Sequence, residues 1–147
     1  MATREPIYAA LWALVSGDTR AQAAFVTMSR YARHFDDVPA TQMPALFLLE
    51  KSERWVKQGR GIPAKRTLES QFMVYTATGS PIALRSPVIN ALMDVLDDII
   101  EKPPNPANVQ TLGGLVNHVY IEGEVIIAEA LLQEKSIFIV PITMLIP

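Results

Sequence analysis

The chain of 147 residues contains no cysteine. A disulfide framework, a thiolate nucleophile and a cysteine-based metal site are therefore excluded, and stability has to come from packing or from partners. Long apolar runs are also missing, because none approaches the roughly 20 residues that span a bilayer. The N-terminus lacks the apolar core of a secretory signal. We expect a soluble protein that stays inside the cell and makes no membrane contact.

Residues that carry chemistry are scarce as well. The two histidines, His34 and His118, are far apart, and neither belongs to a ligand-spaced pair. Glu122 and Glu124 flank Gly123 at strand spacing, which places two carboxylates on one face, as acid–base or metal sites can require. A glycine bulge at a solvated strand end is the commoner origin of this pattern. The sequence therefore predicts no catalytic residue, no cofactor and no metal.

What is present indicates one globular domain, residues 1–147. Half of the residues are apolar, and a chain of this length can bury about 68 to 70% of its unfolded surface. The net charge is −2, but residues 1–85 hold 11 Lys/Arg against 7 Asp/Glu, and residues 86–147 hold 2 against 8. The two halves thus carry net charges of +4 and −6. Such polarity suits head-to-tail contact between copies, although a solvated surface explains it equally well.

Two helices stand out in the pattern. Thr3 as N-cap and Gly17 as stop predict a helix over 4–16. A second helix is predicted to begin at Ser86 and to stop at Lys102, where a proline-rich linker follows. Its inward face is apolar: Ile89, Leu92, Met93, Leu96 and Ile100.

The strands follow period-two patterns. A short strand is predicted within 23–31, and a long one over 45–55. A glycine-rich loop over 57–65 and the alternation after it predict a long projecting antiparallel hairpin. Two last strands are predicted at 115–127 and 135–146. This order favours an α+β domain, with a mostly antiparallel sheet of four to five strands, two helices on one face, and another face that is exposed until a neighbour covers it.

The hairpin and its loop carry a basic cluster. Glu50, Glu53 and Glu69 are interleaved with it, which favours a mixed-charge arm that docks on protein over a nucleic-acid site. Tryptophan and arginine are also enriched at interface hot spots. The predicted partner-interface residues are Lys51, Arg54, Trp55, Lys57, Arg60, Lys65 and Arg66.

Five stretches carry a family resemblance: Arg4–Val15, Val38-Pro39, Met43–Phe47, Gly61–Lys65 and Thr111–Val125. Together they resemble the tail terminator (tail completion) proteins of tailed bacteriophages. The similarity in pattern runs over nearly the whole chain, and its motifs are short and structural. It includes no catalytic signature.

The resemblance implies a virion protein rather than an enzyme. Tail terminators are α+β subunits that form a hexameric ring at the head-proximal end of the tail tube, stop its polymerisation and present a surface to the head connector. The implied partners are further copies of the chain, the tail tube protein, a connector or stopper protein and, in a contractile tail, the sheath protein. DNA meets such a ring only as the genome passing through its channel, and assembly takes place in the host cytoplasm.

Two alternatives stay open at this point. One is another head-to-tail connector component, an adaptor or a stopper, which the same composition allows. The more distant one is a small metal-dependent hydrolase or ligand-binding domain that uses His118, Glu122 and Glu124.

Overall fold

The computed structural model describes residues 3–77, 86–132 and 135–147. Within them the fold is α+β, as predicted. The helices are α1 (Arg4–Ser16), α2 (Thr19–Ala24) and α3 (Ser86–Glu101), with 3-10 turns η1 (Phe35–Asp37) and η2 (Ala40–Gln42). The strands are β1 (Thr27–Ser29), β2 (Ala45–Val56), β3 (Lys65–Ala77), β4 (His118–Ile121), β5 (Ile126–Leu132) and β6 (Lys135–Leu145).

The helix prediction was right for α1 and α3 and missed α2. This six-residue helix is too short to show a periodic apolar face, but it has a clear start, because Asp18 caps it by accepting a hydrogen bond from the amide of Arg20 at 2.8 Å. The strand predicted within 23–31 is correspondingly shorter, since α2 occupies its first residues and β1 holds only three. None of the described helices combines the length and apolarity needed to cross a bilayer.

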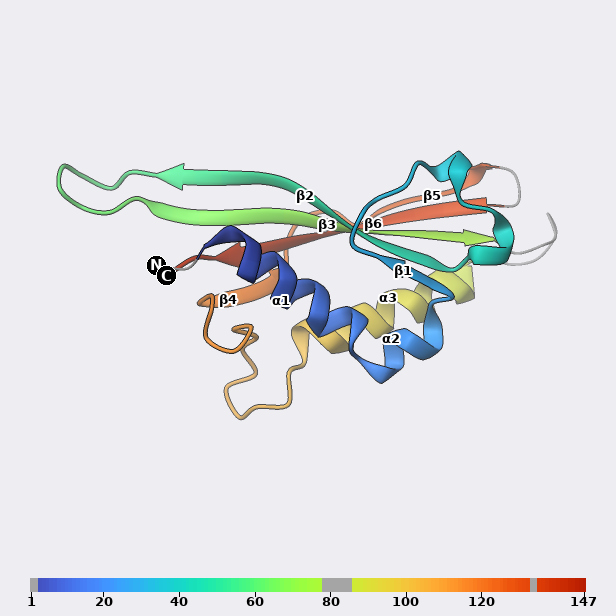
Figure 1. Cartoon of the computed structure of the whole chain (residues 1–147), viewed down its shortest axis with the longest axis horizontal. Helices are drawn as coiled ribbons and strands as arrows, with labels where there is room; N and C mark the ends of the chain where they lie inside the picture. The colour runs from blue at the N-terminus through green and yellow to red at the C-terminus, as the bar shows by residue number, and fades with distance from the viewer. Residues whose placement is uncertain (1–2, 78–85, 133–134) are drawn as a thin grey trace.

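The sheet has six strands instead of the four to five predicted. Its order is β1-β2-β3-β6-β4, with β5 also paired to β6. Every pairing is antiparallel except that of β1 with β2, which makes the sheet mixed. Figure 1 shows the β2–β3 hairpin extending past the helices and past both chain ends. The long projecting hairpin of the prediction is therefore present.

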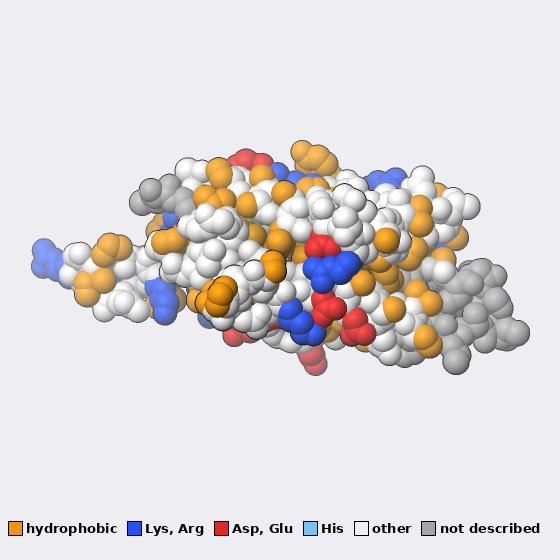
Figure 2. Space-filling view, turned by 90° about the horizontal axis from the view of Figure 1, so that it is seen from below, with side chains coloured by type: hydrophobic (Ala, Val, Ile, Leu, Met, Phe, Trp, Pro, Cys, Tyr) orange, Lys and Arg blue, Asp and Glu red, His pale blue; other side chains and the backbone are white. Residues whose placement is uncertain are grey.

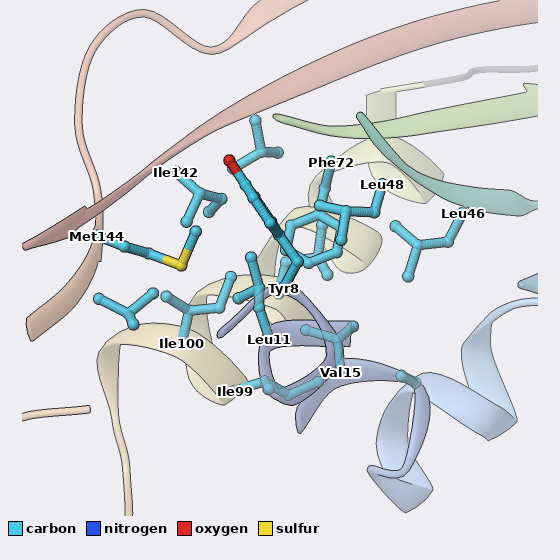
Figure 3. Packing of buried hydrophobic residues seen from close by; sticks show 14 of the residues in the cluster. Tyr8, Leu11, Val15, Leu46, Leu48, Phe72, Ile99, Ile100, Ile142 and Met144 are labelled. Atoms are coloured by element: carbon cyan, nitrogen blue, oxygen red, sulfur yellow. The ribbon is translucent and has the colours of Figure 1, made fainter. Parts of the chain in front are cut away.

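All three helices lie on one face of the sheet (Figure 1), and the main core fills the space between. Leu11 of α1 is completely buried, and Figure 3 shows it between Ile100 of α3 and the sheet residues Phe72 and Ile142. Alternation along β3 supplies this face, because Leu68, Phe72 and Val74 all point towards the helices.

The opposite face, here called the outer face, is covered over one half. Phe47 and Tyr75 form a second buried cluster there with Val38 and Met43, which come from the segment between β1 and β2. The Tyr75 hydroxyl donates a hydrogen bond to the carbonyl of Arg33 at 2.8 Å and ties this segment down. The predicted exposure of the outer face is thus wrong for this half, because the chain itself covers it.

The predicted strand over 115–127 is also wrong, because the chain breaks between β4 and β5. The break lies opposite Pro141 in β6. Pro141 has no N–H to donate, and its carbonyl accepts a bond from the Glu122 amide at 3.3 Å. Gly123 turns the chain here with φ +109°, a conformation that side chains disfavour. The strand resumes at Ile126 and runs further than predicted.

Candidate functional site

The hairpin stands on a three-stranded base. β3 lies between β2 and β6, and the β6 pairing reaches out to Thr67. The amide of Ile146 then bonds to the carbonyl of Arg66 at 3.1 Å, so β3 is supported almost to its distal end. β2 is paired on its other side only at 45–47, by β1. Within the described residues, its distal part is therefore an open sheet edge.

A bulge in β2 decides where the basic cluster points. Ladder pairing is regular up to Glu50, skips Lys51 and resumes at Ser52. Before the bulge, even-numbered residues such as Leu48 share the helix side with Phe72. After it, odd-numbered residues take that side, as Glu53 does opposite Leu68. The seven predicted interface residues consequently divide over three surfaces instead of forming one patch.

Two of the seven, Lys51 and Arg54, lie on the outer face. They line a hollow of about 430 Å3 together with Glu122 and Glu124 from the break between β4 and β5. Lys65 pairs with Val56 and projects on the same side of the hairpin. Basic and acidic side chains thus line the same hollow on the uncovered half of the sheet.

Trp55 and Arg66 lie on the helix side. The guanidinium carbon of Arg66 stands 4.6 Å from the centre of the Trp55 ring, within cation–π range. Arg66 also forms an ion pair with Glu53 at 2.8 Å. Arg4 of α1 forms a second ion pair with the same carboxylate. Hydrogen bonds from Arg4 and then Arg66 lower the pKa of Glu53. The charge of Arg66 is therefore compensated within the chain.

The remaining two, Lys57 and Arg60, lie in the loop between β2 and β3. We call residues 56–64 the hairpin tip. Sequence reasoning missed its apolar members, Val56 and Ile62, which are 48% and 50% exposed. The signal was available, because Ile62 stands between Gly61 and Pro63 in a glycine-rich loop, where few large apolar side chains are expected. Figure 2 shows basic and hydrophobic side chains together at the hairpin end.

A second missed feature lies on the helix side of the body. A hollow of about 420 Å3 opens between α2, α3 and the start of β2, and all of its lining residues are apolar. We call it the α2–α3 hollow. Its lining consists of Ala24, Pro44, Pro87, Val88, Ala91, Leu92 and Val95.

The alternative of a metal-dependent hydrolase or ligand-binding domain depends on where His118, Glu122 and Glu124 lie. Glu122 and Glu124 are both exposed in the break between β4 and β5. His118 sits in β4 with its ring 4.8 Å from that of Tyr120. Across the described ranges, 3–77, 86–132 and 135–147, no three histidine or acidic side chains come close enough to hold a metal ion.

Comparison with solved structures shows that the fold resembles that of a virion chain. The solved structure is described as "Virion of native gene transfer agent (GTA) particle", and the superposition has a TM-score of 0.59 at 8% sequence identity. It covers 95% of this chain and 93% of that one. Neither a model of a known protein family nor a curated protein matches the sequence. The likeness therefore concerns the fold, and it extends over nearly the whole chain.

Proposed function

We propose that this protein is a structural subunit of a phage-like virion, and specifically a tail terminator. The observation that carries the proposal is the fold shared with a gene transfer agent virion chain over nearly the full length of both chains. A chance likeness of one supersecondary motif would cover only part of each chain. The sequence resemblance to tail terminators points in the same direction and was drawn from the residues independently of the fold.

In this role the protein acts by assembly. Six copies form a ring on the head-proximal end of the tail tube, bind the growing end through complementary surfaces and offer no docking surface for another tube subunit. Growth then stops, and the free face of the ring receives the head connector. Weak subunit contacts suffice, because each becomes effectively intramolecular once its neighbours are placed.

The hairpin is the proposed docking arm. It projects from the body on a base of three strands, and Lys51, Arg54, Lys57, Arg60 and Lys65 make no ion pair with another described residue. Exposed cations of this kind raise association rates and select partners of opposite charge. Trp55, 58% exposed and held by Arg66, adds a preorganised aromatic surface.

The test is negative-stain electron microscopy of the purified protein, alone and mixed with a tail tube protein from the same genome. Rings, or tubes of fixed length capped at one end, are the expected result. If tubes stay uncapped and no ring forms at any protein concentration, the terminator role is wrong. Rings that leave the tubes uncapped but bind the head connector would favour the adaptor or stopper alternative.

A further inference from the structure

Two complementary surfaces lie at opposite ends of the molecule. The hairpin tip forms one end of the long axis in Figure 1, and the start of α3, which borders the α2–α3 hollow, lies towards the other. A surface at one end cannot reach its complement at the other end of the same rigid chain. The two can meet only between different copies.

The tip offers aliphatic side chains framed by positive charge. Val56 and Ile62 are each about half exposed, and Lys57 and Arg60 flank them in the same loop. About half of the surface of these branched aliphatic side chains therefore has no packing partner within the described chain. Apolar surface rimmed by charge is instead typical of a contact with another protein.

The α2–α3 hollow offers the opposite features. Its lining is wholly apolar, and Val88 at its edge is 42% exposed. Asp94 is exposed on α3, one helical turn beyond Ala91 of the lining. The hollow thus presents an apolar floor that suits an aliphatic side chain and an acidic residue beside it that suits a lysine or arginine.

We propose that the hairpin tip of one copy inserts Ile62 into the α2–α3 hollow of the next copy, with Lys57 and Arg60 facing Asp94. This contact rests on the proposed function, which it deepens by naming the surface that joins neighbours in the ring. It is heterologous, since each copy uses its tip once and its hollow once. Contacts of that kind generate closed rings when the rotation between neighbours divides a full turn.

The absence of native cysteine allows a direct test by disulfide cross-linking. Ile62→Cys and Val88→Cys are made separately in the full chain, with a size tag on one, and the two proteins are mixed and oxidised. The matched control pairs Ile62→Cys with Ile127→Cys, a comparably exposed isoleucine on β5. Samples are taken from preparations in which electron microscopy shows rings or capped tubes.

The expected result is a covalent heterodimer from the Ile62→Cys and Val88→Cys mixture, well above the control pair and above either variant alone. A chain carrying both substitutions should give a ladder that ends at the ring size. Heterodimer at the control level in samples that contain rings overturns this contact and leaves the proposed function standing. Preparations with neither rings nor capped tubes overturn the proposed function, and this contact with it.

A second measurement does not depend on cysteine chemistry. Ile62→Asp would place a charge in the apolar hollow and should weaken self-association at least about tenfold, since an unpaired charge is costly to bury. Ile127→Asp, at a comparably exposed position outside both surfaces, should leave association unchanged. Sedimentation velocity over a concentration series measures both. Equal effects of the two substitutions would contradict the insertion of Ile62.

Discussion

The carboxylate of Glu53 on β2 accepts a hydrogen bond from the guanidinium of Arg4, which lies 49 positions earlier at the start of α1. Its other oxygen accepts a hydrogen bond from Arg66 at 2.9 Å. The carboxylate therefore joins the first turn of the helix layer to both strands of the hairpin.

Glu53→Gln should lower the free energy of unfolding by up to about 1 kcal/mol, because the Arg4 partner is exposed and the Arg66 pair is only partly buried. The effect should depend on pH. The pKa of Glu53 is lower in the folded chain than in the unfolded chain. Its contribution is therefore complete above the ordinary carboxyl range and is lost as the pH falls through the folded-state value.

Urea unfolding of both proteins at pH 7 and at about pH 3 measures this dependence. The difference between wild type and Glu53→Gln should shrink at the lower pH. Other carboxylates with lowered pKa values, such as those of Glu5 and Asp18, are common to both proteins and cancel in the comparison. A difference that stays constant with pH would exclude a charge-based role.

Gly123→Ala should destabilise the fold by more than about 1 kcal/mol, because φ +109° strains any residue with a side chain. The new Cβ itself would make only an ordinary contact with the Pro141 ring at 3.5 Å. Gly59→Ala is the matched control. Its φ lies outside the strained region, and its Cβ would meet the end of the Ile62 side chain, which can move. Thermal unfolding measures both, and equal midpoints would contradict the strain argument.

Leu11→Ala should cost about 2 to 5 kcal/mol, because Leu11 is completely buried where α1, α3 and the sheet meet. Leu49→Ala removes the same atoms from a side chain that is 39% exposed on the outer face and should cost far less. Urea unfolding curves compare the two. Similar costs would mean that the helix layer packs more loosely on the sheet than the structure indicates.

The double reversal Arg54→Glu with Arg60→Glu should weaken tube capping and leave the thermal midpoint unchanged, because both side chains are exposed and neither forms an ion pair with a described residue. Arg54→Lys with Arg60→Lys keeps the charge and serves as control. Counting capped tubes by electron microscopy gives the result. Capping at the wild-type level would remove the cations of the hairpin from the docking surface.

Much of the fold follows from local periodicity. α1 and α3 are long enough for their apolar faces to repeat, and the loop glycines with the alternation in β3 define the hairpin. α2 is too short for either signal. The break between β4 and β5 was unpredictable for another reason. Pro141 lies in β6, whereas the break lies between β4 and β5, the strands that pair with β6. The effect of Pro141 can therefore be predicted only when this pairing is known.

Prediction of the candidate site from the sequence is limited in the same way. The basic character of the hairpin was evident, but the face that each residue occupies depends on the bulge at Lys51, which reverses the alternation along β2. Strict alternation from Leu48 would have placed Arg54 with the helices and Trp55 outside. The α2–α3 hollow could not be predicted from the sequence, because its lining comes from segments that are far apart in the chain: Ala24, Pro44 and the first turns of α3.

The pairing of β3 with β6 also orders events during synthesis. Gln71 and Pro141 are ladder partners across 70 positions, and β6 in turn holds both β4 and β5. A ribosome therefore releases α1, the hairpin and α3 before the strand that completes the sheet exists. Until β6 is made, one side of β3 lacks its partner and the arm lacks a firm base. Competence to join other copies is thus acquired only once β6 has been made and has paired with β3.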